Sequence, residues 1–235
     1  MTDYQPHIEI LDFEAGARAA CGVAIVIDVF RAFSLACYAF ANGARRMIPV
    51  ADIEDARRLK AAHPEFVTLG ERHARKLEGF DFGNSPTYIE HENFTGRTLV
   101  HTTHAGTQGL VNATQAEVVL TGSLVNAAAI CRYVAKLQPA VISIVRMGQD
   151  ACARCEEDDL CAELLGARFS GRMFDTATIR ARLRRAPSAQ KFFDPQATWA
   201  PERDFELCTD ADRFDFVLRL TPGADGRGEL QAIPS

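Results

Sequence analysis

A continuous apolar run, Gly22-Val-Ala-Ile-Val-Ile-Asp28, has the length of a single β-strand. Because no polar residues alternate with the apolar ones, both faces of this strand should be buried, as in a parallel sheet. Residues 31–41 follow, are rich in alanine and suit a helix, which Asn42-Gly43 should end. The run therefore predicts a strand followed by a helix that crosses back over a sheet.

The same alternation continues along the chain. We expect further strands at residues 46–50, 66–70, 98–102, 117–121 and 140–145, and helices at residues 52–63, 123–137, 156–169 and 177–185. Pro49 suggests that the strand at 46–50 lies at an edge of the sheet, where a missing N–H is tolerated. Strands that alternate with helices indicate an α/β fold with a mostly parallel or mixed sheet and right-handed crossovers.

The length of 235 residues suits one α/β domain. We expect residues 1–222 to form it, alone or with a small C-terminal lobe, and residues 223–235 to be a flexible tail. Residues 205–220 have the composition for one or two more strands. Hydrophobic residues make up 47% of the chain and charged residues 24%, values typical of a globular protein with a substantial core.

Charge and hydropathy exclude several functional classes. The net charge of −5 argues against non-specific nucleic-acid binding. The chain has neither a signal-peptide pattern at its start nor an apolar run of about 20 residues that would cross a bilayer. We therefore expect a cytoplasmic protein without a membrane partner. Its seven dispersed cysteines are then expected to be thiols.

The predicted strands end in unusually polar residues, and the carboxyl ends of parallel strands are where α/β proteins bind ligands. The residues at these ends are Asp28, Arg31, Glu71, Arg72, Thr102, Thr103, Thr107, Ser123, Asn126 and Arg146. Carboxylates suit Mg²⁺, arginines suit an anion, and hydroxyls and amides at helix N-termini suit phosphate or sulfonate oxygens. Together they favour metal-assisted chemistry on an anion. Taken singly, each also fits a helix cap, a surface ion pair or an ordinary loop hydroxyl.

Four further features have alternative interpretations. The loop at residues 79–86 is either a structured turn or a substrate-covering loop that brings Asn84 and Ser85 to the site. The acidic run at residues 156–159 is either a solvated helix start or a source of ligands. Cys152, Cys155 and Cys161 have the spacing of a partial thiolate metal site, but no second Cys-x-x-Cys completes it. His101 and His104 flank the threonines, as a general acid or as structural residues.

Ordered motifs between residues 22 and 220 resemble the 2-phosphosulfolactate phosphatase family of coenzyme M biosynthesis. They are Val26-Ile-Asp-Val-Phe-Arg-Ala32, Ala41-Asn-Gly-Ala44, Gly70-Glu-Arg72, Gly79-Phe-Asp-Phe-Gly-Asn-Ser-Pro86, Thr102-Thr103 with Gly106-Thr107, Gly122-Ser-Leu-Val-Asn-Ala127, Glu157-Asp158 with Cys161-Ala162, and Phe205-Glu-Leu-Cys208. The resemblance implies a three-layer α/β/α fold and a Mg²⁺-dependent phosphatase that converts 2-phospho-3-sulfolactate to 3-sulfolactate. The expected partner is thus a small anionic phosphoester, and a homodimer is the default assembly.

The resemblance implies which residues form the site, and we infer their individual roles. Asp28 and Glu71, with Glu157 or Asp158, would hold the metal. Phosphate would be bound by Arg31, Thr103 and Ser123, and the carboxylate or sulfonate by Arg72 or Arg146. The remaining candidates for substrate binding are Asn84, Ser85, Thr102, Thr107 and Asn126.

The chain departs from the family pattern at two places near the expected site. Phe33 stands where the family has threonine-type residues, and His104-Ala105 replaces an asparagine and adds one residue. Two other functions therefore remain open: a phosphatase of the same fold that acts on another small phosphorylated acid, or a non-catalytic anion-binding homologue.

Overall fold

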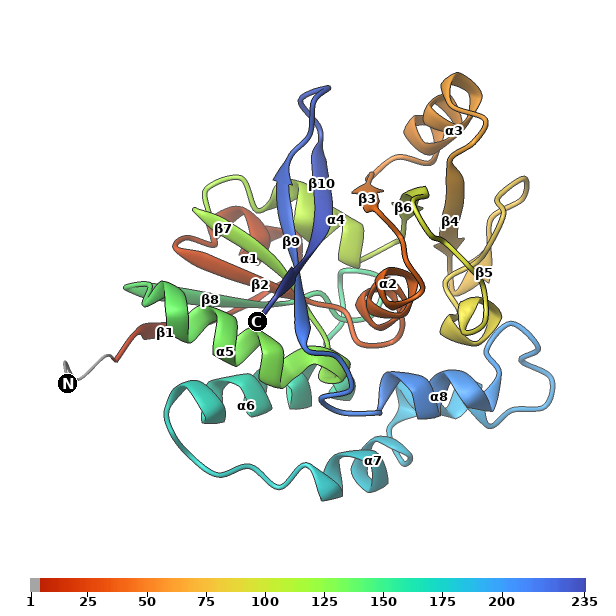
Figure 1. The fold of residues 1–235 in the computed structure, drawn as a ribbon. Coiled ribbons are helices and arrows are strands. Elements are labelled where there is room, and N and C mark those ends of the chain that lie inside the picture. The colour runs from red at the N-terminus through yellow and green to blue at the C-terminus, as the bar shows by residue number, and fades with distance from the viewer. Residues whose placement is uncertain (1–4) are drawn as a thin grey trace.

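The computed structural model describes residues 5–235, and its strands form one sheet of ten (Figure 1). The strands are β1 His7–Asp12, β2 Val23–Ile27, β3 Arg46–Pro49, β4 Val67–Arg72, β5 Arg75–Lys76, β6 Thr98–Thr102, β7 Val118–Gly122, β8 Val141–Arg146, β9 Phe216–Pro222 and β10 Gly228–Pro234. The α-helices are α1 Phe13–Ala19, α2 Ala32–Ala41, α3 Ile53–Ala62, α4 Gly106–Asn112, α5 Ala127–Leu137, α6 Glu156–Phe169, α7 Ala177–Leu183 and α8 Glu202–Cys208. Three 3₁₀ segments are η1 Pro86–Ile89, η2 Leu124–Asn126 and η3 Pro187–Phe192.

The strand order is β1-β8-β2-β7-β9-β10-β3-β6-β4-β5. Strands β1, β8, β2 and β7 pair in parallel, and so do β3, β6 and β4. Between these two parts lies the antiparallel hairpin of β9 and β10, which pairs antiparallel with β7 on one side and β3 on the other. The sheet is therefore mixed, and the hairpin joins two parallel parts.

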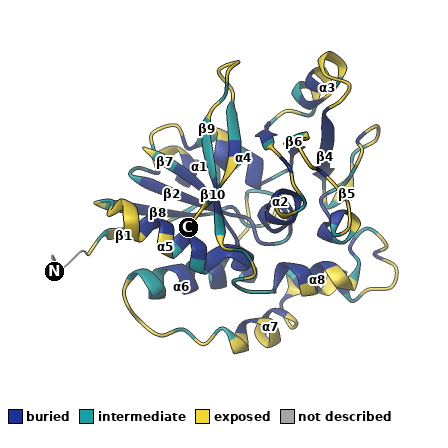
Figure 2. Ribbon diagram, in the orientation of Figure 1, coloured by how far each residue is buried: buried dark blue, intermediate teal, exposed yellow. Residues whose placement is uncertain are grey.

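Helices cover both faces of the sheet. Successive side chains of β2 point to opposite faces and all of them are apolar, so both faces have to be covered. Val26 packs into one core with α1, α2 and α4, whereas Ile25 and Ile27 pack into another with α5 and α6. Figure 2 shows that β2 and β8 are mostly buried, whereas α3, α7 and α8 carry exposed residues. This arrangement confirms the α/β class and its three layers. Within residues 5–235, no helix combines the length and hydropathy that a membrane span requires.

Two expectations about the sheet and the C-terminal region are wrong, and a third holds in part. The flexible tail at 223–235 is instead largely β10, whose Leu230 is fully buried and pairs with Leu220 of β9 and Met47 of β3. Residues 205–220 do hold one strand, because β9 begins at Phe216, but residues 205–208 belong to a helix. Pro49 does not mark an edge, because β3 pairs with β10 around Met47 and needs no donor from Pro49 on that side.

Candidate active site

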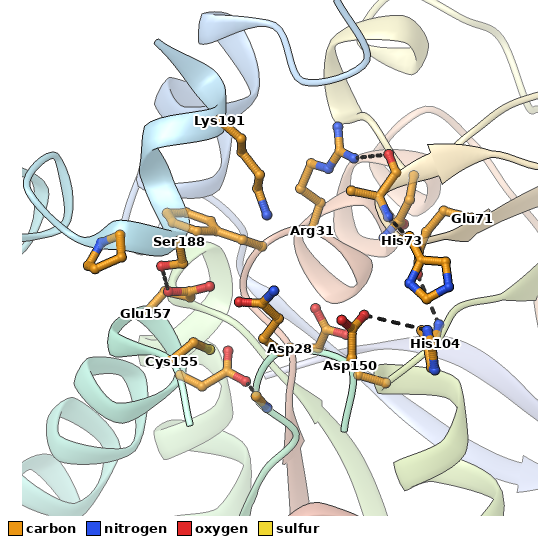
Figure 3. A pocket seen from close by; sticks show the side chains of 18 residues that line it. Asp28, Arg31, Glu71, His73, His104, Asp150, Cys155, Glu157, Ser188 and Lys191 are labelled. Carbon is orange, nitrogen blue, oxygen red and sulfur yellow. Dashed lines mark hydrogen bonds and ion pairs between the residues drawn. The ribbon is translucent and has the colours of Figure 1, made fainter. Parts of the chain in front are cut away.

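A cavity of about 350 Å³ lies at the carboxyl ends of β2, β4, β6 and β8 (Figure 3). Both parallel parts of the sheet contribute to it, and α6 and η3 complete its wall. Its polar lining comprises Asp28, Arg31, Glu71, His73, Asn84, His104, Gln149, Asp150, Cys155, Glu157, Asp158, Ser188 and Lys191. Six residues expected at the site therefore meet in one place: Asp28, Arg31, Glu71, Asn84, Glu157 and Asp158.

Asp28 directly follows β2, and its carboxylate accepts two backbone hydrogen bonds. Ala32 N donates to Oδ1 at 3.2 Å, and Gly106 N donates to Oδ2 at 2.9 Å. Burial raises the pKa of Asp28 to about 7, and the charges of Glu71 and Glu157 act in the same direction, against the lowering effect of the two backbone bonds. A carboxylate at this position is thus electrostatically unfavourable unless a cation accompanies it.

Glu71 and Asp158 are held in the same way, each by amides of two different segments. Glu71 accepts from Ala74 N at 2.7 Å and from His104 N at 2.9 Å. Asp158 accepts from Val29 N at 2.9 Å and from Gly148 N at 2.8 Å. Burial and the charges of Asp28 and Glu157 raise the pKa of Asp158 well above its usual range. These buried carboxylates therefore tie the loops of the cavity wall together.

Glu157 completes the group of carboxylates and accepts a hydrogen bond from the Ser188 hydroxyl. Glu157 and Asp158 lie in the first turn of α6, so the acidic run supplies two residues to the wall rather than only a solvated helix start. The donor atoms offered by this group are all carboxylate oxygens. Such a set suits a hard divalent cation such as Mg²⁺.

Two cationic side chains line the opposite side of the cavity. Arg31 is 2% exposed and donates to Asp204 at 2.6 Å, to the Trp199 carbonyl at 2.9 Å and to the Ala74 carbonyl at 2.9 Å. Lys191, on η3, extends into the cavity and forms no ion pair with any residue in the range 5–235 (Figure 3). Asp204 therefore neutralises the charge of Arg31, whereas the charge of Lys191 has no ion-pair partner within residues 5–235.

The threonines after β6 lie outside the cavity wall. Thr103 and Thr107 bond to each other: Thr103 N donates to Thr107 Oγ1 at 3.0 Å, and Thr107 N donates to Thr103 Oγ1 at 3.2 Å. Thr102 Oγ1 accepts from Arg72 at 3.1 Å, and Arg72 also donates to the Glu71 carbonyl. These hydrogen bonds hold the loop that carries His104, and none of the three threonines lines the cavity.

The other expected site residues also have partners away from the cavity. Ser123 Oγ lies 2.7 Å from Ser34 Oγ and caps no helix. Arg146 is paired with Asp12 and Asp159, at 2.8 and 3.0 Å. Asn126 donates to the Phe216 carbonyl at 3.3 Å. Ser85 donates to Asp204 at 2.7 Å and so supports the residue that holds Arg31.

Several wall residues were not among the expected ones, notably His73, Asp150, Ser188 and Lys191. His73 immediately follows Glu71-Arg72, at the end of a predicted strand. This position in the sequence could have identified it as a residue of the site. Ser188 and Lys191 lie on η3, in a segment without a strand nearby, and only tertiary packing brings them to the cavity.

The two histidines near the threonines differ. His101 is fully buried, with Nε2 3.2 Å from Asn84 Oδ1, and burial, together with the charge of Arg72, lowers its pKa to about 3. It cannot supply a proton near neutral pH. His104 lines the cavity and is 38% exposed.

The three cysteines of the partial motif do not converge on a metal site. All seven cysteines are free thiols. Cys152 is exposed, Cys155 lines the cavity, and Cys161, on α6, is buried in the core. Burial raises the pKa of the Cys155 thiol far above its usual value, with Asp158 and Glu157 adding to the effect, so this thiol is protonated.

Comparison with known proteins identifies the family of this chain. The sequence model described as 2-phosphosulpholactate phosphatase matches residues 12–223. A "Probable 2-phosphosulfolactate phosphatase" of Bacillus subtilis is 31% identical, over 86% of this chain and 88% of the relative. Proteins with the same name from Thermotoga petrophila (33% identical, 86% and 91% covered) and Parasynechococcus marenigrum (31% identical, 94% and 96% covered) also match. The chain therefore belongs to the 2-phosphosulfolactate phosphatase family.

Proposed function

We propose that this chain is a Mg²⁺-dependent phosphatase that hydrolyses 2-phospho-3-sulfolactate to 3-sulfolactate and phosphate. Its family and the names of its relatives support this reaction. One structural observation carries the proposal: four buried carboxylates and two cationic side chains line a single cavity. A cavity of this composition suits a metal ion and a polyanion that contact each other.

The carboxylates that would hold the metal are Asp28, Glu71, Glu157 and Asp158. Their proximity is unfavourable without a cation, as the raised pKa of Asp28 indicates. Mg²⁺ prefers oxygen ligands, and this group offers nothing else. When bound, Mg²⁺ would neutralise charge on the oxygens of the transferring phosphoryl group.

The anionic groups of the substrate would be bound by the cationic side of the cavity. The Lys191 ammonium offers three N–H donors and no ion pair occupies it within residues 5–235. The Arg31 guanidinium is held rigidly by Asp204, so its remaining N–H donors are preorganised. The substrate carries a phosphate, a sulfonate and a carboxylate group. We propose that Lys191 binds the one that lies next to η3, and that Arg31 orients another of these anionic groups.

A second candidate keeps the reaction but changes the substrate to another small phosphorylated acid. It is favoured by His104 and Ala105, which line the cavity at the loop where the sequence departs from the family pattern. In both cases we propose a cytoplasmic enzyme whose partner is a small anionic phosphoester, without a nucleic-acid partner.

Phosphate release tests the proposal. Purified protein should release phosphate from 2-phospho-3-sulfolactate with Mg²⁺ and not with excess EDTA. Asp28→Asn should lower kcat at least about 100-fold, the scale on which loss of one electrostatic contact to the transition state acts. The matched control is Asp55→Asn, at an exposed carboxylate of α3.

Two results would count against parts of the proposal. If 2-phospholactate, which lacks the sulfonate, is hydrolysed as well as the proposed substrate, the second candidate is correct. Absence of EDTA-sensitive phosphate release from either compound would overturn the phosphatase assignment for this chain.

A further inference from the structure

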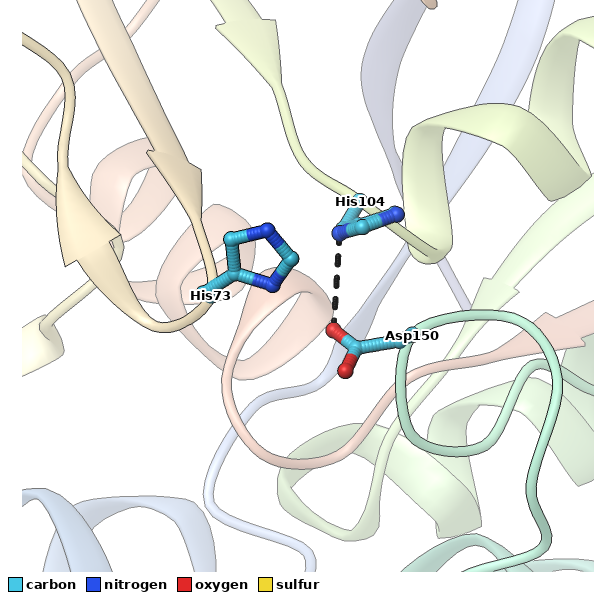
Figure 4. A group of neighbouring side chains, drawn as sticks. All are labelled: His73, His104 and Asp150. Atoms are coloured by element: carbon cyan, nitrogen blue, oxygen red, sulfur yellow. Dashed lines mark ion pairs between the residues drawn. The ribbon is translucent and has the colours of Figure 1, made fainter.

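Besides the four buried carboxylates, the cavity wall holds three side chains that are more exposed and are of the types that ligate metals. His73 follows β4, His104 follows β6 and Asp150 follows β8. One ligand atom of each lies within 4.8 Å of the other two. Figure 4 shows the two imidazole rings and the carboxylate turned towards a common space.

The spacing of His104 and Asp150 suits a shared ion better than a direct hydrogen bond. His104 Nδ1 lies 3.4 Å from Asp150 Oδ1, and this nitrogen is buried without a hydrogen-bond partner among residues 5–235. An N–H···O bond is shorter, about 2.9 Å. Two ligands of a tetrahedral zinc ion, each about 2.0–2.1 Å from the metal, are about 3.3–3.4 Å apart.

The three ligands stand on loops that buried carboxylates already hold in place. Glu71 binds the amides of Ala74 and His104, so it keeps the two histidine loops together. The His73 and His104 ring centroids are 5.1 Å apart. Asp150 belongs to a closed turn in which Gln149 N donates to the Ala153 carbonyl at 2.7 Å, and Asp158 anchors this turn through Gly148 N. Little loop ordering is therefore needed for the three to bind one ion.

We propose that His73, His104 and Asp150 form a second cation site, which takes a borderline divalent ion such as Zn²⁺. Two imidazoles and one carboxylate favour such an ion over Mg²⁺, which prefers oxygen ligands alone. Three protein ligands leave a coordination position open to the cavity, as in catalytic zinc sites. An anionic oxygen of the phosphoester would occupy the open position, and this part of the proposal rests on the proposed function. The binding of the ion itself does not depend on that function.

Zinc binding to tag-free protein tests the site independently of turnover. Calorimetric titration with Zn²⁺ is carried out in excess Mg²⁺, which occupies the carboxylates. One Zn²⁺ per chain should bind, and Co²⁺ in its place should give the visible absorption of a low-coordinate site. His73→Asn and His104→Asn should each weaken Zn²⁺ binding more than about 100-fold, because loss of an outer-shell partner alone costs about 10–100-fold. Asparagine also tolerates the left-handed backbone of His73 (φ 52°).

Two control variants locate the ion. His91→Asn, at an exposed histidine outside the cavity, should leave Zn²⁺ affinity unchanged, and so should Asp28→Asn. Far-UV circular dichroism and thermal melting check that each variant is folded. The proposal is overturned if Zn²⁺ does not bind in the presence of Mg²⁺. It is equally overturned if binding survives both histidine changes, or if Asp28→Asn abolishes it, which would place Zn²⁺ on the carboxylates.

Discussion

Asp204 is the residue on which the cationic side of the cavity most depends. It is fully buried and accepts hydrogen bonds from Arg31, Ser85 and Thr87. Asp204→Asn should lower the free energy of unfolding by about 3–5 kcal/mol, because it leaves Arg31 buried without a counter-charge. Urea denaturation measures this loss.

The control is Asp210→Asn, at an exposed carboxylate paired with Arg213. This substitution should change the free energy of unfolding by less than about 1 kcal/mol. Equal losses in the two variants would show that the Arg31 pair contributes no more than a surface pair.

His101 should make the protein sensitive to acid. Its pKa is about 3 when folded and about 6.5 when unfolded, so the unfolded chain binds the extra proton between these values. The contribution of neutral His101 is therefore complete above pH 6.5 and is lost as pH falls towards 3. At pH 5 the loss should be about 2 kcal/mol. Urea denaturation at pH 7 and pH 5 measures the fall in the free energy of unfolding between these pH values. This fall should be smaller for His101→Gln than for the parent chain, and it should be the same for His91→Asn as for the parent chain.

At the level of single residues, the sequence predicts the carboxylates better than their partners. Asp28 and Glu71 follow apolar strands, so their place at the site is readable from local pattern. Lys191 lines the cavity from a 3₁₀ segment, and Asp204 supports Arg31 from a helix. The contact between Asp204 and Arg31 joins residues more than 100 positions apart in the chain. No periodicity in the sequence encodes such a contact.

Among the elements, the loop from β8 to α6 is the most sensitive to substitution. Gly148 has φ 64°, and a Cβ there would lie 2.2 Å from the Ala153 carbonyl oxygen. Gly148→Ala should therefore disrupt the turn that carries Asp150. A left-handed backbone conformation alone costs an alanine about 1–2 kcal/mol, and the free energy of unfolding should fall by more than this amount. It should also lower Zn²⁺ affinity.

Gly171→Ala provides the comparison for this change. Gly171 has φ 66° and open space where the Cβ would stand, so only the backbone cost of about 1–2 kcal/mol applies. Urea denaturation of both variants separates the two effects. If Gly148→Ala and Gly171→Ala lowered the free energy of unfolding equally, the turn at Gly148 would be able to move and accommodate the new methyl group without further cost.

Strands and helices with strong patterns are predictable here, and those that depend on pairing are not. The run at 22–28 and the helix at 156–169 appear where the pattern places them. Strand β10, in contrast, directs only Leu230 fully into the core, and its neighbours are polar or half-exposed. Pairing with β9 and β3 stabilises this strand, and its own sequence has no strong strand pattern. The local sequence therefore resembles that of a flexible tail.

In the whole molecule, β10 and β9 join the two parallel parts of the sheet, which do not otherwise pair within residues 5–235. Leu230 pairs with strands on both sides of it, β9 and β3. Leu230→Ala should lower the free energy of unfolding by about 2–5 kcal/mol, as for other buried leucines. Gln231→Ala, at the exposed neighbour, should change it by less than about 0.5 kcal/mol. Thermal and urea denaturation measure both, and similar small effects would show that the hairpin is dispensable.

The hairpin also sets the order in which a newly synthesised chain can be completed. Strands of both parallel parts leave the ribosome before β9 and β10, because these two strands follow all the others in the chain. Until then, β7 and β3 each present an unpaired edge to other nascent chains. Slow translation of residues 216–234 would prolong that exposure. Premature termination before β10 would release a protein whose two sheet edges are open to aggregation.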